Sequence, residues 1–141
     1  MYEAVCHCGK VVVGVARKPR SLTQCNCSIC RRYGALWAYY KAESARVLKG
    51  KGALAVYRRT PRGLGFHHCK SCGCVMFHRR ESTGRMGVNA RNFDPEFVAQ
   101  VRISLLDGDS TWKVLEHSIQ PNLFRSPAPP VRRRGRAPGS S

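Results

Sequence analysis

Short runs of β-branched and aromatic residues, separated by glycine, proline and polar residues, recur along most of the chain. Apolar runs of this kind, four to eight residues long between turn residues, are typical of β-strands. Residues 10–16 are rich in valine, and residues 35–41 contain one tryptophan and two tyrosines. The pattern predicts strands at residues 10–16, 35–41, 53–58, 75–78, 101–105 and 112–115.

Signals for helices are few. The run Asp94-Pro95-Glu96 places a capping side chain before a proline, which is typical of the first turn of a helix. It predicts a short helix that ends at about Gln100. The expected fold class is therefore all-β, with short antiparallel strands and little helix.

The length of 141 residues fits one domain, which we place at residues 1–124. Residues 125–141 are rich in proline and arginine and poor in large apolar residues, so we expect a disordered tail there. No apolar run approaches the roughly 18 residues that cross a bilayer, and the first residues do not resemble a secretory signal. We therefore expect a cytoplasmic protein with no membrane partner.

The chain is strongly basic, with a formal net charge of +17 at pH 7. That sum counts each cysteine as neutral, and seven thiolates on two zinc ions would lower it by about three charges. Five of the 25 basic residues lie in the tail 125–141, which contains no acidic residue. The charge makes nucleic acid a possible partner, although the chain shows no recognition helix and no interleaved aromatic and basic stripe.

Eight cysteines fall into three tight clusters, and cytosolic cysteines spaced in this way more often bind metal than form disulfides. The first and last clusters each contain a pair that is followed at once by glycine. These pairs are Cys6 with Cys8, and Cys69 with Cys72. Glycine permits the tight turn in which backbone amides donate to metal-bound sulfurs, so the pattern predicts a closed, structural four-cysteine zinc site. The alternative is a set of buried free thiols.

The middle cluster supplies only three thiolates, from Cys25, Cys27 and Cys30. Three protein ligands leave a fourth position for water or substrate, as catalytic zinc sites do. Arg31 and Arg32 follow directly and could lower thiolate pKa values or attract an anionic ligand. They could equally form a solvated basic turn.

Another residue could close this middle site and make it structural. Cys74 is the one cysteine left unassigned, and five histidines provide further candidates, with His67 and His68 directly before Cys69. If Cys74 is not a ligand, we expect it to be a small core residue.

The order C-x-C-G at Cys6, C-x-C-x-x-C-R-R at Cys25 and F-x-x-C-x-x-C-G at Phe66 resembles the glutathione-dependent formaldehyde-activating enzyme family, which also includes centromere protein V. Weaker similarities are Gly34, Val88-Asn89 and Trp112, so the resemblance spans about residues 2–120. It implies a zinc-stabilised β-tent fold, related to zinc-binding chaperones of small GTPases. It also implies carbon–sulfur lyase chemistry on glutathione and formaldehyde.

The resemblance further implies two zinc ions, a structural one on Cys6, Cys8, Cys69 and Cys72 and a catalytic one on Cys25, Cys27 and Cys30. We expect a substrate thiol to enter the open position and react with a small aldehyde, while Arg31 and Arg32 hold carboxylates of a thiol such as glutathione. Two rival hypotheses remain: a zinc-stabilised module that binds nucleic acid through its basic surface and tail, and a structural protein with two closed sites.

Overall fold

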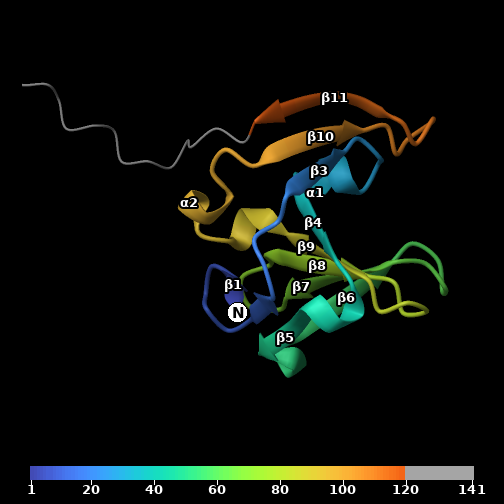
Figure 1. Cartoon of the computed structure of the whole chain (residues 1–141). Helices are drawn as coiled ribbons and strands as arrows, with labels where there is room; N and C mark the ends of the chain where they lie inside the picture. The colour runs from blue at the N-terminus through green and yellow to red at the C-terminus, as the bar shows by residue number, and fades with distance from the viewer. Residues whose placement is uncertain (120–141) are drawn as a thin grey trace, which may run out of the picture.

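A computed structural model describes residues 1–119 of the chain as eleven strands, two one-turn α-helices and three 3-10 turns, arranged in two sheets (Figure 1). The strands are β1 (Tyr2–Val5), β2 (Val12–Val15), β3 (Ser21–Cys25), β4 (Trp37–Tyr40), β5 (Ala45–Lys49), β6 (Leu54–Arg58), β7 (Gly65–Cys69), β8 (Val75–Arg79), β9 (Met86–Asn89), β10 (Arg102–Leu106) and β11 (Val114–Ile119). The helices are α1 (Cys30–Tyr33) and α2 (Pro95–Val98), and the 3-10 turns are η1 (Ala42–Ser44), η2 (Lys51–Ala53) and η3 (Ala90–Asn92).

The smaller sheet has the order β1-β2-β5, and the larger has the order β11-β10-β3-β4-β9-β8-β7-β6. Every pairing is antiparallel except that of β10 with β3, which is parallel and places Leu106 opposite Cys25. The expectation of a mostly-β chain with little helix is confirmed. The expectation of antiparallel strands throughout is wrong at this one pair, because a long connection through β4 to β9 separates β3 from β10 and brings the later strand back in the same direction.

All six predicted strands are present, within a few residues of their predicted bounds. The last one, β11, starts at Val114 rather than Trp112, because Trp112 has a positive φ of 59° and belongs to the preceding turn. The predicted helix is α2, in which the side chain of Asp94 accepts from the amide of Glu96. It ends at Val98, because Ala99 already has an extended ψ of 138°, and Gln100 then has a positive φ of 63°.

Buried side chains form two clusters. The larger contains Val13 and Val15 of β2, with Leu22, Leu36 and Met76, and draws its residues from both sheets. The smaller consists of Cys25, Cys30, Ala35, Trp37 and Phe66. The second cluster matters for the site, because two of the middle cysteines are part of a buried apolar group.

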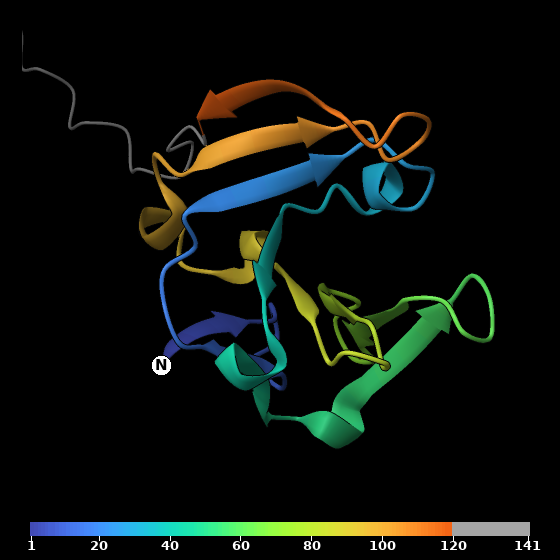
Figure 2. The same cartoon turned by 45° about the vertical axis from the view of Figure 1, so that its right-hand side comes forward.

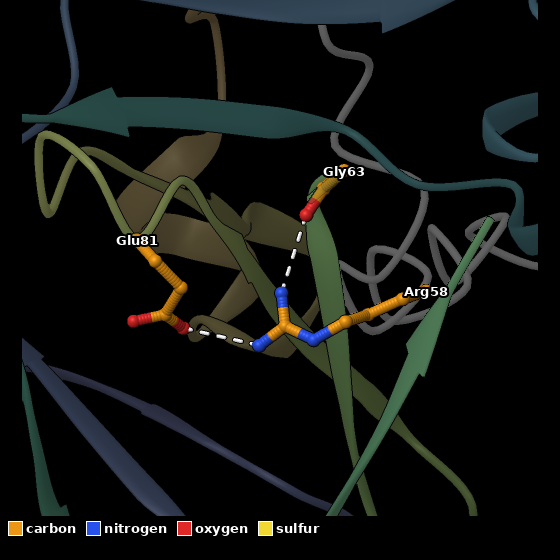
Figure 3. A network of polar contacts seen from close by, with 3 residues as sticks. All are labelled: Arg58, Gly63 and Glu81. Carbon is orange, nitrogen blue, oxygen red and sulfur yellow. Dashed lines mark hydrogen bonds and ion pairs between the residues drawn. The ribbon is translucent and has the colours of Figure 1, made fainter. Parts of the chain in front are cut away.

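Two neighbouring hairpins, β6–β7 and β8–β9, project from one side of the larger sheet (Figures 1 and 2). Arg58 joins them, since its guanidinium donates to the carbonyl of Gly63 at 3.2 Å and pairs with Glu81 at 3.2 Å (Figure 3). No helix in the part of the chain that the structure describes is long and apolar enough to span a membrane. The predicted tail 125–141, and the end of the predicted domain 1–124, lie outside the described residues.

Candidate metal centres

The cysteines of the first and third sequence clusters meet in space and form one group, which we call the scaffold cluster: Cys6, Cys8, Cys69 and Cys72. Their four sulfurs lie within 4.8 Å of one another, and the Sγ–Sγ distances from Cys8 to Cys6 and to Cys69 are both 3.6 Å. Zn–S bonds of about 2.3 Å in a tetrahedron place sulfurs about 3.8 Å apart. The four thiols therefore fit a zinc ion.

The turns around the scaffold cluster have the geometry that the glycines predict. Gly9 and Gly73 have positive φ angles of 79° and 77°, and their amides close the turns onto the carbonyls of Cys6 and Cys69. The amide of Val11 donates to Cys6 Sγ at 3.3 Å. Amide donors of this kind stabilise a thiolate and are typical of metal-bound cysteines.

The same effect is strongest at Cys72. Backbone amides, first that of Cys74 and then that of Cys8, donate to its sulfur and lower its pKa from 9.0 to about 5. A thiol with this pKa is a thiolate at neutral pH. The scaffold cluster thus already has a ligand in the charged form that metal binding requires.

The middle cysteines form a second group, which we call the three-cysteine cluster: Cys25, Cys27 and Cys30. Cys25 ends β3, Cys27 lies in the following turn, and Cys30 begins α1, so a single short segment supplies all three sulfurs. The amide of Cys27 donates to Cys25 Sγ at 3.5 Å, and that of Cys30 donates to Cys27 Sγ at 3.4 Å.

A tryptophan side chain also contacts this cluster. The indole Nε1 of Trp37 on β4 donates to Cys30 Sγ at 3.3 Å. Burial raises the pKa of Cys30 far above its usual value, against the lowering effect of this hydrogen bond. Burial likewise raises the pKa of Cys25, whereas hydrogen bonds, chiefly from the amide of Cys30, lower the pKa of the partly buried Cys27. A bound cation deprotonates a thiol ligand, and the three converging sulfurs therefore fit a metal ion as well.

Neither of the residue types proposed as a fourth ligand reaches the three-cysteine cluster. Among residues 1–119, no further His, Cys, Asp or Glu has a ligand atom close enough to join the three sulfurs. Cys74 instead lies beside the scaffold cluster, where its carbonyl accepts from the amide of Cys69 at 3.0 Å and its side chain packs, half-buried, against the larger core cluster. Cys74 therefore packs at the edge of the core, which agrees only in part with the expectation of a small core residue.

The two arginines after the cluster are exposed on α1. Arg32 donates to the carbonyl of Ser28 at 2.7 Å, which holds the turn between the cysteines. The main effects on the pKa values of the three thiols are burial and hydrogen bonds, and neither arginine is among them.

Sequence reasoning missed three residues around the three-cysteine cluster: Asn26, Trp37 and Gly108. The position of Asn26 between two cysteines was a signal that could have found it. Trp37 and Gly108 come from β4 and from the loop after β10, so only the strand pairing places them there.

Comparisons with known proteins identify a family and a similar structure. A family model described as glutathione-dependent formaldehyde-activating enzyme matches residues 1–106, which end with β10. A crystal structure of a protein from Rhodobacter sphaeroides is 32% identical to the chain, with a TM-score of 0.58. The match covers 65% of this chain and 87% of that protein.

Proposed function

Because this chain belongs to the glutathione-dependent formaldehyde-activating enzyme family, we propose that it is a carbon–sulfur lyase that joins a thiol such as glutathione to a small aldehyde, or reverses that reaction. The observation that carries the proposal is the three-cysteine cluster, which has three sulfurs and no fourth ligand group among residues 1–119. A closed site has no position for a reactant, whereas this arrangement leaves one.

We propose one zinc ion on each cysteine cluster, the first structural and the second catalytic. A zinc ion bound by the three-cysteine cluster supplies Lewis-acid chemistry, which lowers the pKa of a thiol and polarises a carbonyl. The reaction forms a bond between the thiol sulfur and the carbonyl carbon. The carbon–oxygen π bond breaks, and the proton of the thiol ends on the new hydroxyl group.

The residues of the chain hold and shield the reacting groups. Cys25, Cys27 and Cys30 hold the metal, and the indole of Trp37 withdraws negative charge from Cys30 through its hydrogen bond. Partly buried apolar side chains around the cluster exclude water, which strengthens electrostatic interactions there. The exposed Arg31 and Arg32 attract the carboxylates of an anionic thiol.

The test compares two cysteine substitutions in the full chain. Cys27→Ser is expected to lower the zinc content from two ions to one and to abolish thiol–aldehyde turnover with the fold retained. Cys74→Ser is the matched control, because Cys74 belongs to neither cluster, and it should keep both ions and the activity. If Cys27→Ser lost one zinc ion but kept its turnover, the catalytic role of the cluster would be wrong.

A second candidate function, binding of nucleic acid, rests on the two projecting hairpins. Six arginines lie at or near their tips: Arg58, Arg59, Arg62, Arg79, Arg80 and Arg85. Glu81 is the one acidic residue between positions 57 and 86, and it is already paired with Arg58. Five of the six arginines are exposed, so the hairpins present a concentrated positive charge.

This function predicts binding to a single-stranded oligonucleotide that weakens steeply with salt. Replacing Arg59, Arg62 and Arg80 together by alanine should lower the slope of log K against log salt by about 2. Removal of residues 125–141 separates the contribution of the tail from that of the hairpins. Binding that does not respond to salt would rule out this function.

A further inference from the structure

The loop 107–113, which joins β10 to β11, lies directly against the three-cysteine cluster. A Cβ atom built on Gly108 would lie 2.3 Å from Cys25 Sγ and 3.6 Å from Cys27 Cβ. Only a residue without a side chain permits this approach of the backbone to the sulfur. Figure 2 shows the loop, in orange, beside the cyan turn of α1 that begins with the third cysteine.

A single side chain from the cysteine segment fastens the loop in place. The side-chain amide of Asn26 makes two hydrogen bonds to the loop. Its Nδ2 donates to Asp107 Oδ1 at 3.1 Å, and its Oδ1 accepts from the backbone amide of Asp109, also at 3.1 Å. Its own backbone amide donates to the carbonyl of Leu106 at 3.2 Å. The loop and the ligand-bearing turn therefore form one hydrogen-bonded unit.

Hydrogen bonds within the loop hold Trp112 in an unfavourable backbone conformation. Asp107 accepts at Oδ2 from the amide and hydroxyl of Thr111, at 3.2 and 2.8 Å, and its carbonyl accepts from the amide of Trp112 at 2.7 Å. The φ of Trp112 is 59°, in the left-handed region that a bulky residue rarely adopts. Such conformations persist where the surrounding structure enforces them, and they cluster at ligand contacts.

The indole of Trp112 is next to the site but mostly open to solvent. Its Cζ3 atom lies 3.6 Å from the same Cβ position on Gly108, so Gly108 separates the indole from the sulfur of Cys25. The side chain is 70% exposed. It thus offers a large apolar and planar surface that the chain itself leaves uncovered.

The other surroundings of the cluster are also apolar. Five partly buried side chains pack around the small core cluster that contains Cys25 and Cys30: Ile29, Tyr33, Leu64, Val75 and Leu106. Formaldehyde carries only hydrogen on its carbonyl carbon and has no group that could contact an indole. An exposed tryptophan at this place therefore adds binding only for a larger reactant.

We propose that Trp112 is a specificity-determining residue of the three-cysteine site, which binds an apolar or planar substituent carried by one of the reactants. The inference rests on the proposed function, because it takes the three-cysteine cluster as the place where the reactants meet. Either the thiol or the aldehyde could carry the substituent. The loop 107–113 holds Trp112 in position, and it lies beyond the part of the chain that the family model matches.

Binding can be measured without turnover, because the chain has two tryptophans and only one is exposed. Trp37 is fully buried, so the exposed Trp112 should give the long-wavelength part of the tryptophan fluorescence. A ligand that covers Trp112 should shift that part of the emission to shorter wavelength. Three thiols are compared, namely 2-mercaptoethanol, glutathione and 2-phenylethanethiol. Each is added to protein that has been loaded with a zinc ion at both cysteine clusters. The absorption of a cobalt-substituted three-cysteine cluster reports thiol binding independently of fluorescence.

We expect Trp112→Ala to weaken 2-phenylethanethiol about five- to tenfold and to leave 2-mercaptoethanol within twofold, because the indole contact is worth about this much. Trp112→Phe should restore most of the lost affinity, and the exposed neighbour Lys113→Ala is the matched control. A parallel series fixes glutathione and compares turnover of formaldehyde with that of phenylacetaldehyde. A loss confined to phenylacetaldehyde assigns the substituent to the aldehyde, and a loss confined to 2-phenylethanethiol assigns it to the thiol.

Equal loss for all reactants in Trp112→Ala, or no loss for any of them, would overturn the inference. Metal content and melting of each variant exclude a folding defect, and Trp112→Phe keeps the test valid if the alanine variant is unstable. If the wild-type protein turns over thiol and aldehyde but Trp112→Ala has no selective effect, the inference alone fails. If thiols bind selectively through Trp112 but no pair reacts, the proposed function alone fails.

Discussion

The two cysteine clusters use the same ligand atoms but differ in how they are built. In the scaffold cluster, Cys6 follows β1 of the smaller sheet and Cys69 ends β7 of the larger one, so the four sulfurs connect the two sheets. In the three-cysteine cluster, six consecutive positions supply every sulfur. The scaffold cluster therefore closes long stretches of chain, whereas the three-cysteine cluster closes one turn.

The two clusters also differ in their exposure and in the side chains that surround them. Cys8 of the scaffold cluster is exposed at the surface. In the same cluster, backbone amides donate to the sulfur of Cys72 and stabilise its thiolate. The three-cysteine cluster is set among aromatic and aliphatic side chains and is touched by a loop from elsewhere in the chain. From this comparison we expect the scaffold cluster to stabilise the fold and the three-cysteine cluster to tolerate substitution while the fold is kept.

The largest effect is expected from Cys69→Ser, which breaks the connection between the sheets. Structural zinc sites contribute on the order of 10 kcal/mol, so the variant should lose both its zinc in this cluster and its cooperative fold. Thermal melting followed by circular dichroism, with zinc content, measures this. Cys30→Ser is the comparison, and it should still melt cooperatively. If the two variants melted alike, the division of roles between the clusters would not hold.

A smaller effect is expected from Gly108→Ala, which places a methyl group against Cys25 Sγ. The clash should weaken metal binding at the three-cysteine cluster about 100-fold, or about 3 kcal/mol, and leave the scaffold cluster unchanged. Competition with a chelator gives the two affinities separately. Gly52→Ala is the control, because a Cβ atom there meets nothing within 4 Å. Unchanged affinity in Gly108→Ala would show that the loop does not press on the sulfur.

The smallest effect concerns pH and the aromatic residues beside the three-cysteine cluster. His78 is buried against Trp37 at 4.6 Å between ring centroids, and burial lowers its pKa from 6.5 to about 4. The unfolded chain therefore binds a proton between these values that the folded chain does not, so stability falls as the pH drops below 6.5. At pH 5.5 the loss should be about 1 kcal/mol relative to pH 7.5.

The control for this pH dependence is His78→Leu, which cannot take up the proton. Urea unfolding at both pH values, with zinc in excess, should show a smaller drop in stability for the variant than for the wild type. Release of metal at the lower pH should destabilise the wild type and the His78→Leu variant equally. It therefore cancels when the two drops in stability are subtracted. Identical drops would show that His78 does not carry the effect.

Local features of the fold and site could be predicted from the sequence, and long-range ones could not. Cys6-x-Cys8-Gly9 and its counterpart at Cys69 predict their own turns, since the glycine φ angles and the amide–sulfur bonds involve neighbouring residues. The position of Cys74 depends on which way β8 leaves the turn, and the cysteine spacing contains no information about that. The sequence also predicted strands such as β2 and β8 but missed five others, namely β1, β3, β5, β7 and β9. In β3, for example, Thr23 and Gln24 dilute the apolar pattern.

The contact between Gly108 and Cys25 depends on pairing across about eighty residues. The strand and helix propensities of neighbouring residues cannot predict such a contact, because the contact arises from the register in which β10 pairs with β3. Trp37 reaches Cys30 for a similar reason, since β4 must pair with β3 at Thr23 before the indole faces the sulfur.

The parallel pairing of β10 with β3 has a consequence for how this site could diversify. Parallel strands end at the same edge of a sheet, so the chain leaves β10 at the place where β3 delivers Cys25. A connection at such an edge tolerates changes in length and composition, because the strands on either side hold its ends. We therefore expect that insertions or replacements between Gly108 and Val114, with Gly108 itself kept, would give relatives of this protein new substrate ranges while the proposed metal ligands stay in place.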